Sequence, residues 1–427
     1  MTRAAAAPSA PAKPRAAAVL AERFRAVRAA TAALAAPLSP EDCQVQSMPD
    51  ASPVKWHLAH TTWFFETFVL ERAEPSFAPF DPAFRVLFNS YYNAVGPQHA
   101  RPARGLVSRP SLERVLAYRA AVEERVLALL AHGAPDEELP RTVELGAHPA
   151  QQHQELILTD LKHALAQSPL RPGYRALAEA PPAAVAPLRF EPFTEGVRWI
   201  GHGDGGFAFD NEGPRHRVLL QPFALGSRCA TNGEWLAFLA DGGYERPELW
   251  LSDGWAWRQA EGVDAPLYWQ RDGDAWTVLT LGGVRAVRAD EPVTHVSYYE
   301  ASAFAEWSGA RLPSEFEWEV AAYEIAPEGN FVERDLLHPA PAAAGAHLAQ
   351  LFGDVWEWTR SDYAPYPGFA PAAGALGEYN GKFMCNQRVL RGGSCATPQS
   401  HIRASYRNFF APTARWQFTG VRLARET

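Results

Sequence analysis

Four histidines in two separate segments have the residue type and spacing to hold a metal ion. His148 and His153 lie in "AHPAQQHQELILTDLKH", and His57 and His60 lie in "WHLAH". Metal-binding histidine pairs on a helix usually sit four positions apart, because about 400° of rotation returns both rings to one face. The position four before His153 is Pro149, which has no ligand atom. Three neutral imidazoles that leave open positions suit a redox-active iron.

His148 precedes His153 by five positions, which places the two rings about 140° apart on an ideal helix. Proline suits the first turn of a helix, so the sequence predicts a helix that begins at Pro149, with His148 as an N-cap residue able to turn inward. His57 and His60 are three positions apart, on neighbouring faces of another helix, and one of them could face the interior. Alternatively, all four histidines cap helices or make ordinary hydrogen bonds.

The elements that must position these residues are helices. Apolar residues recur with helical period over 16–35, 53–72, 111–132 and 149–166, and the short connections contain proline. Four such helices predict a bundle. The segment between the second and third helices is long and rich in aromatic and turn residues, which is typical of a functional loop.

The composition changes at 167–190, where proline and alanine dominate, and the later chain is rich in glycine, tryptophan and short β-like segments such as "HRVLLQPFAL" and "WTVLTLGG". Helical interruptions are predicted at 231–241 and 299–308. We therefore predict a loop-rich α+β domain. The expected organisation is a flexible tail over 1–14, a helical bundle over 15–170, a linker over 171–190 and a second domain over 191–427.

The bulk properties restrict the class of function. A net charge of −8, with scattered basic residues, predicts no nucleic-acid binding and favours small-molecule chemistry. No run of 18 apolar residues exists, so no membrane-spanning segment is expected. The four cysteines lack zinc-type spacing and are interpreted as reduced thiols of a cytoplasmic protein.

Several motifs, in a fixed order, are similar to those of one enzyme family. They are "SPVKWHLAHTTWFFETFVL", "FNSYYNAVG", "RPARGLVSRPSL", "QQHQELILTDLKH", "DNEGPRHRV", "RLPSEFEWEVAA", "GDVWEWT", "GKFMCNQRVLRGGSCATP" and "RASYRNFF". Over almost its whole length the chain resembles the sulfoxide synthases of ergothioneine biosynthesis. The resemblance implies a DinB-like four-helix bundle followed by a loop-rich domain like the formylglycine-generating enzyme and the C-type lectins.

The resemblance implies a mononuclear non-haem Fe(II) enzyme. Such an enzyme uses O2 to join a thiol, either cysteine or γ-glutamylcysteine, to the imidazole of hercynine, the trimethylated betaine of histidine, with sulfoxidation. It implies three histidine ligands, of which the first corresponds to His60, the last to His153 and the middle one to Pro149. Either His148 replaces the missing ligand, or water or another side chain completes the site, or the chemistry has been lost or changed. His57 and Glu155 are further candidate ligands.

The resemblance also assigns residues that act on the thiol and on oxygen. Tyr92, with Tyr91 beside it, corresponds to the phenol that delivers a proton, and a phenol can donate while neutral at pH 7. Arg101 and Arg104 correspond to the residues that bind the carboxylate of the sulfur substrate, which a guanidinium suits bidentately. The "NSYY" loop resembles that of the branch that uses free cysteine. Without the resemblance, the tyrosines would be packing aromatics and the arginines solvated.

A further set corresponds to the hercynine pocket. Gln152 matches the residue that hydrogen-bonds the imidazole, and Asn408, Phe409 and Phe410 match a segment that lines the pocket. Trp416 is a further candidate for its wall. Aromatic faces attract a trimethylammonium group by roughly 0.5–2 kcal/mol. The pocket is expected between the two domains, because domain interfaces are common sites of ligand binding.

Three other functions are compatible with parts of this sequence. A related selenoneine synthase would use iron and hercynine with a seleno-sugar donor, and the altered "HPAQQHQE" segment could mark such a branch. A hercynine-binding protein that has lost iron is the non-enzymatic alternative. Formylglycine generation needs paired cysteines near the C-terminus, whereas Cys395 has no partner close behind it in the sequence.

Overall fold

The computed structural model describes residues 13–132, 136, 138–203, 205–343, 345–371, 374–378 and 380–427. These residues form two compact units. Unit 1 comprises the chain up to Ser90 and Pro97–Gln154, and unit 2 comprises Tyr91–Gly96 and Glu155–Thr427. Residues 1–12 of the predicted tail lie outside the described residues, and the first helix begins at Lys13. The boundary between the units, at Gln154 and Glu155, falls inside a helix. The domain ranges 15–170 and 191–427 therefore stay predictions.

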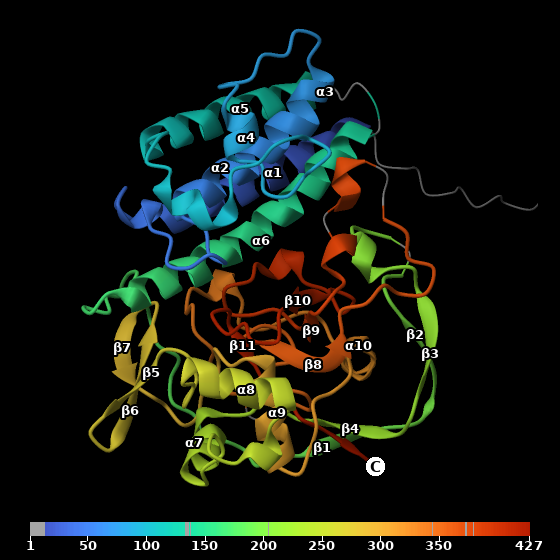
Figure 1. Cartoon of the computed structure of the whole chain (residues 1–427). Coiled ribbons are helices and arrows are strands. Elements are labelled where there is room, and N and C mark those ends of the chain that lie inside the picture. Colours follow the sequence, from blue (N-terminus) through green and yellow to red (C-terminus); the bar gives the residue numbers. More distant parts are fainter. Residues whose placement is uncertain are drawn as a thin grey trace, which may run out of the picture. The chain divides into compact units, whose positions relative to one another are not determined.

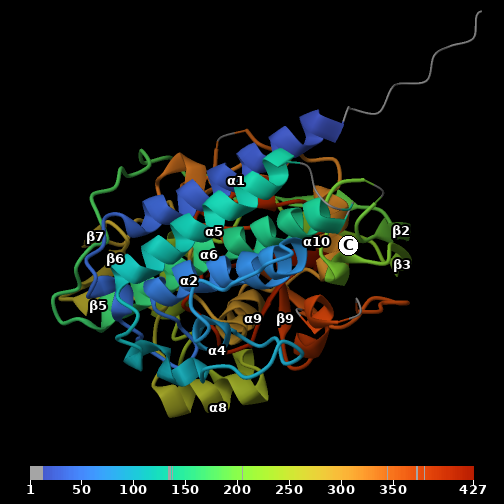
Figure 2. The same ribbon diagram turned by 90° about the horizontal axis from the view of Figure 1, so that it is seen from above.

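The long helices of unit 1 are α1, α2, α5 and α6, which run side by side (Figure 1 and Figure 2). All four predicted helical segments are confirmed, with different ends. No helix in the described part of the chain is both long enough and apolar enough to cross a lipid bilayer. The helices that begin in unit 1 are α1 (Lys13–Ala35), α2 (Val54–Phe65), α3 (Glu71–Ala73), α4 (Phe84–Leu87), α5 (Leu112–His132) and α6 (Glu138–Gln167).

Helix α2 is the central helix of unit 1, and every one of its residues is buried. A π-helical turn, Glu66–Leu70, extends it toward α3. Phe65 packs edge-on against Phe24 of α1. On another side, a Cβ atom at Gly146 of α6 would lie 2.6 Å from the ring of Phe64, so only glycine allows α6 to approach α2 this closely. Histidines on α2 therefore lie inside the bundle.

The predicted start of a helix at Pro149 is wrong, because α6 begins at Glu138 and passes through the proline. Proline removes one backbone hydrogen bond, to the carbonyl of Leu145, at a cost of about 3 kcal/mol in a helix interior. The apolar face continues on both sides of it, which favours an unbroken helix. His148 is consequently an interior helical residue rather than an N-cap. The buried apolar residues of this face include Val143, Ala147, Ala150 and Ile157.

The described residues of unit 2 form four small sheets and four further α-helices, which confirms the predicted loop-rich α+β domain (Figure 1). The sheet orders are β10-β9-β8-β11, β1-β4-β12, β5-β6-β7 and β2-β3. The helices are α7 (Asn232–Ala240), α8 (Ser252–Glu261), α9 (Tyr298–Trp307) and α10 (Glu315–Ala322). The strands are β1 (Phe190–Phe193), β2 (Gly196–Ile200), β3 (His216–Leu220), β4 (Phe223–Gly226), β5 (Trp269–Asp272), β6 (Ala275–Thr280), β7 (Gly283–Ala286), β8 (Trp356–Asp362), β9 (Arg388–Arg391), β10 (Asn408–Phe410), β11 (Thr419–Gly420) and β12 (Ala424–Glu426).

Buried ion pairs hold the irregular backbone of unit 2 together. Arg391 of β9 is fully buried and donates to Glu315 and Glu319 of α10, at 2.8 and 3.0 Å. Arg407, just before β10, donates to the same Glu315 at 2.8 and 3.0 Å. These pairs tie β9 and the approach to β10 to one helix. A buried charge left without its partner is costly, so the pairs restrict the backbone here to one arrangement.

Candidate functional site

Three of the four candidate histidines lie together inside unit 1. His57 and His60 extend from α2, and His153 extends from α6. The ring centroid of His153 lies 5.0 Å from that of His57 and 4.9 Å from that of His60. The structure thus brings the two predicted ligands His60 and His153 into ring contact.

His60 has one nitrogen available for a metal. Its Nδ1 lies 2.7 Å from the backbone oxygen of Phe88, which can only accept a hydrogen bond, so Nδ1 carries the proton and Nε2 has the lone pair. Burial lowers the pKa of His60 to about 3, so the ring is neutral at pH 7. Its face stacks on Trp56, with centroids 4.6 Å apart. A hydrogen bond at the far nitrogen is the usual way in which proteins orient a metal-binding histidine.

His153 is held in a similar way by a histidine. Its Nδ1 lies 2.7 Å from Nδ1 of His57, so one of the two rings donates this hydrogen bond and the other accepts it. Burial lowers the pKa of His153 well below its usual value, and the neighbouring His60 lowers it further. The ring is therefore neutral at pH 7.

His148 faces a different partner. Its Nε2 lies 2.8 Å from Nη2 of Arg23, and a guanidinium can only donate, so the lone pair of a neutral His148 is engaged there. Arg23 also donates to Glu144, one turn before His148 on α6. The predicted N-cap geometry that would have turned His148 toward the other imidazoles does not exist, because α6 is continuous. The structure groups His148 with Arg23.

The donor set fits ferrous iron in chemical type, since neutral imidazole is a common iron ligand. Within the described ranges, however, no three His, Cys, Asp or Glu side chains are arranged around one metal position. Glu155, the other candidate ligand, accepts hydrogen bonds from Trp356 Nε1, Ser394 Oγ and Thr397 Oγ1 at 2.8, 2.5 and 2.7 Å within unit 2. Burial raises the pKa of this carboxyl group. Its oxygens are thereby engaged away from the histidines.

The two predicted carboxylate-binding arginines differ in exposure. Both belong to the 3₁₀ helix Arg101–Leu106 of unit 1. The guanidinium of Arg104 lies 3.4 Å from the ring centroid of Trp56, and its Nη1 donates to Ser52 at 2.9 Å. The same indole contacts all three clustered histidines, with His60 stacked on it. Arg101 is half-exposed and donates to the backbone oxygen of Asp50. Arg104 is therefore the arginine beside the imidazoles.

The predicted catalytic tyrosines lie in unit 2. Their rings stack with centroids 4.9 Å apart. The backbone after them is fixed because Glu378 accepts hydrogen bonds from the amides of Asn93 and Ala94, at 3.0 and 2.9 Å. Tyr92 is only 2% exposed, and burial raises the pKa of its phenol, so Tyr92 stays protonated at pH 7. It is stacked on Tyr91, which is partly exposed.

The predicted pocket residues of β10 join the same cluster of unit 2. Phe409 stacks on Tyr363, with centroids 4.0 Å apart, and lies 5.8 Å from Phe383. The ring of Phe383 in turn contacts Tyr91 at 5.4 Å. We call Tyr91, Tyr92, Tyr363, Phe383 and Phe409 the aromatic cluster. Sequence reasoning missed Tyr363 and Phe383, since nothing in their local sequence marks them.

The remaining predicted residues lie close to these groups. Asn408 accepts a hydrogen bond from the amide of Phe409. Phe410 contacts Trp416 edge-on at 5.8 Å, and Trp416 Nε1 donates to Asp160 of α6 at 3.2 Å. Gln152 is half-buried in unit 1, next to His153 on α6. Trp56 was also missed; its position four before His60 on one helix face was the available signal.

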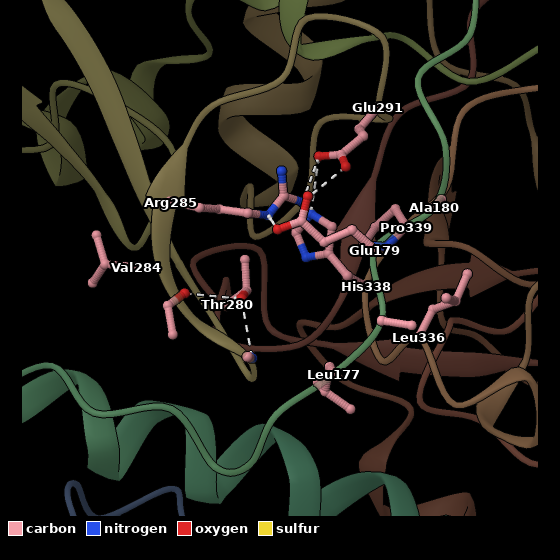
Figure 3. A pocket seen from close by; sticks show the side chains of 13 residues that line it. Leu177, Glu179, Ala180, Thr280, Val284, Arg285, Glu291, Leu336, His338 and Pro339 are labelled. Atoms are coloured by element: carbon pink, nitrogen blue, oxygen red, sulfur yellow. Dashed lines mark hydrogen bonds and ion pairs between the residues drawn. The ribbon is translucent and has the colours of Figure 1, made fainter.

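A separate cavity of about 90 Å³ lies in unit 2 (Figure 3). Its polar walls are formed by Arg285, Glu291 and His338, and Glu291 accepts from the other two at 2.8 and 3.2 Å. None of the sequence-predicted site residues lines it. Glu291 pairs with both groups, whereas the buried Nη1 of Arg285 and Nδ1 of His338 have no hydrogen-bond partner among the described residues.

Two family models match the chain. Residues 23–167 match the DinB superfamily, and residues 193–340 and 324–427 match the sulfatase-modifying factor enzyme 1-like domain. These matches agree with a helical unit followed by a domain of small sheets and loops, as predicted.

Curated relatives match nearly the whole chain. A hercynine oxygenase of Mycolicibacterium thermoresistibile is 35% identical over 402 residues, which covers 88% of each protein. A hercynine oxygenase of Mycobacterium tuberculosis is 36% identical over 402 residues, or 88% of this chain and 91% of that protein. A formylglycine-generating enzyme of Streptomyces coelicolor is 29% identical over 266 residues, or 52% of this chain and 83% of that enzyme. The chain, which joins a DinB superfamily match to a sulfatase-modifying-factor-like match, therefore belongs to the hercynine oxygenase family.

Proposed function

We propose that this protein is an iron(II)-dependent hercynine oxygenase that uses O2 to join a thiol to the imidazole of hercynine, with sulfoxidation, in ergothioneine biosynthesis. The observation that supports it most is the pair of neutral imidazoles, His60 and His153, whose ring centroids lie 4.9 Å apart and whose Nδ1 atoms are each hydrogen-bonded. Both are neutral because burial lowers their pKa values, as metal ligands must be. Ferrous iron, when bound, supplies adjacent positions for a thiolate and for O2.

Arg104 is proposed to bind the carboxylate of the sulfur donor. Its guanidinium is fixed between Trp56 and Ser52, so little side-chain entropy is lost when the carboxylate binds. Arg101, on the same 3₁₀ helix, would contact the substrate from a more exposed position. Since the ring of Trp56 also stacks on His60, the indole positions the arginine and the imidazole together.

Tyr92 is proposed as the proton donor to reduced oxygen, with Tyr91 stacked on it. A phenol whose pKa is raised by burial keeps its proton at pH 7 and gives it up only to a strongly basic acceptor. The hercynine side of the site is proposed to involve Gln152 for the imidazole and Asn408, Phe409, Phe410 and Trp416 for the rest of the molecule. The half-buried ring of Phe409 offers a face to the trimethylammonium group.

The sulfur donor is proposed to be cysteine or γ-glutamylcysteine, and the protein is proposed to work in the cytoplasm. Its four cysteines are free thiols, as in proteins of a reducing compartment. We further propose that 15–170 and 191–427 are its two domains, with 171–190 as the linker.

The test is anaerobic reconstitution with Fe(II), followed by O2 and hercynine together with cysteine, γ-glutamylcysteine or a seleno-sugar in parallel. We expect about one iron per chain and O2-dependent formation of a sulfoxide from hercynine and one of the thiols. Turnover with the seleno-sugar alone would assign the protein to selenoneine synthesis. Hercynine binding without iron uptake would overturn the enzymatic proposal.

A further inference from the structure

We propose that this protein holds its iron through only two of its own side chains, Nε2 of His60 and Nε2 of His153, and leaves the coordination position beside Pro149 open to an exogenous ligand. This inference rests on the proposed function only for the identity of the metal. It concerns what is particular to this chain, a proline at the place on α6 where a second helical ligand would stand.

Both proposed ligands, His60 and His153, are already oriented by hydrogen bonds at Nδ1. A histidine that presents Nε2 to a metal normally has its Nδ1 hydrogen-bonded to a carbonyl or another acceptor. His60 has such a bond to the backbone oxygen of Phe88, and His153 has one to Nδ1 of His57. In the described part of the chain, no hydrogen bond engages Nε2 of either ring. In the tautomer in which His153 donates from Nδ1 to His57, both His60 and His153 carry a lone pair on Nε2, and we infer that both bind one ion.

His57 supports His153 instead of binding the metal. Nδ1 of His57 faces Nδ1 of His153 at 2.7 Å, so its lone pair accepts the proton that His153 must carry at Nδ1 when Nε2 is the ligand. His57 is only 2% exposed and is fixed by α2, which holds this acceptor in place. His57 is thus a positioning residue that sets the tautomer of His153.

The other candidate ligands, His148 and Glu155, are engaged by other partners. The lone pair of His148 is taken by Arg23, and the oxygens of Glu155 are taken by three donors of unit 2. Position 149 is four before His153 on a continuous helix, which is the spacing that puts two side chains on one face. Proline fills that position without offering a donor atom. Among the described residues no third ligand replaces it.

The consequence is a more open coordination sphere. Two imidazoles leave four of six octahedral positions to water, substrates and O2, where three would leave three. Fewer protein donors also mean weaker retention of the metal in the absence of other ligands. A small neutral nitrogen donor such as free imidazole should occupy the open position and raise the apparent affinity for the metal, by mass action.

The experiment restores the missing donor. Pro149→His places an imidazole four residues before His153, and Pro149→Ala is the matched control that removes the proline without adding a donor. Co2+ affinity is measured by optical titration, and the number of bound imidazoles is counted by pulsed electron paramagnetic resonance of the Cu2+ forms. We expect two protein imidazoles in the wild type and in Pro149→Ala, and three in Pro149→His. We also expect at least about tenfold tighter Co2+ binding in Pro149→His.

Two further variants test the role of His57. His57→Gln keeps an acceptor for the Nδ1 proton of His153, whereas His57→Leu does not. We expect His57→Gln to retain two coordinated imidazoles with Co2+ affinity near that of the wild type. For His57→Leu we expect a loss of about 10–100-fold, as for other residues that support a metal ligand.

Other results would overturn the inference. They are three protein imidazoles in the wild type, equal losses in both His57 variants, or no change in Pro149→His. None of these measurements uses hercynine or O2, so they are separate from the test of function. Iron-dependent turnover together with three imidazoles in the wild type would leave the proposed function standing and remove the two-ligand site. A two-imidazole site without turnover would do the reverse.

Discussion

The two units hold their chemically important side chains by opposite means. In unit 1, neutral rings extend from long helices, and each candidate ligand is fixed by one hydrogen bond, from His60 to Phe88 and between His153 and His57. In unit 2, the aromatic cluster lies on irregular backbone that charged networks hold, such as Arg391 with Glu315 and Glu319. The candidate ligands of unit 1 therefore depend on proton positions, and the network around Arg391 in unit 2 depends on complete ion pairs.

The two units should therefore tolerate different kinds of substitution. A neutral imidazole binds a metal ion through its lone pair and has no proton to lose first. A buried carboxylate that loses its arginine must either stay as an uncompensated charge or take up a proton, and both are costly. Small side-chain changes in unit 1 should therefore alter its metal affinity, whereas small changes in unit 2 should alter the free energy of unfolding.

The largest effect is expected from removing a ligand of unit 1. His153→Ala should abolish iron and Co2+ binding, because only one oriented imidazole remains. His148→Ala, five positions earlier on the same helix, should leave metal content unchanged, since Arg23 is its partner. Metal analysis after anaerobic reconstitution checks both. Loss of iron in His148→Ala would return that residue to the ligand set.

The corresponding change in unit 2 should affect stability. Arg391→Met removes the buried cation that pairs with Glu319 and one of the two that pair with Glu315, which keeps Arg407; breaking a buried pair costs about 3–5 kcal/mol. Urea denaturation measures the loss. Arg246→Met, whose partners Asp241 and Glu248 are largely exposed, is the control and should leave the urea midpoint unchanged. Equal midpoints for the two variants would contradict the role of the buried network.

Acid should destabilise unit 1 through its neutral histidines. His60 has a pKa of about 3 when folded, against the ordinary value of about 6.5 when unfolded, so the unfolded state binds more protons between those values. The free energy of unfolding of the metal-free protein should fall by about 2 kcal/mol from this residue alone between pH 6.5 and 5. His60→Gln should show a shallower dependence in urea titrations at the two pH values. An unchanged slope would mean that His60 is protonated in the folded state.

The smallest expected effect concerns the aromatic cluster. Phe409→Leu removes a ring face from the proposed trimethylammonium site, a loss of roughly 0.5–2 kcal/mol in hercynine binding. Calorimetric titration of hercynine measures it. Phe193→Leu, on β1 and stacked on Phe223, is a matched control in which binding should not change. Weakened binding in both variants would indicate a general packing effect.

The helices of unit 1 could be predicted from sequence because helical spacing is local. The positions of His57 and His60 on one helix, and of His153 on another, followed from this spacing. The start of α6 was predicted wrongly, because the local preference of Pro149 for a first turn was outweighed by packing of the apolar face on both sides. The partner of His148, Arg23, lies 125 residues away and has no local signal.

In unit 2 the sequence predicted α7, α9 and the β-like segments of β3, β4 and β6, but not α8, α10, the other strands or the connections between them. Lys382, which donates to the backbone oxygen of Tyr91, lies 291 residues after it, and Arg391 lies 76 residues after Glu315. Charge and aromatic character are visible in the sequence, whereas the choice of partner among many similar residues depends on the folded chain. The family resemblance supplied candidate residues there, and spacing alone would not have done so.

Gly146 matters for the proposed metal centre because it has no side chain at the point where α6 meets α2. A single methyl group there would meet the ring of Phe64 at 2.6 Å and push two helices apart, and these helices present His153 on one side and His57 and His60 on the other. A larger residue at position 146 would therefore change the spacing between the two groups of histidines without altering any polar atom.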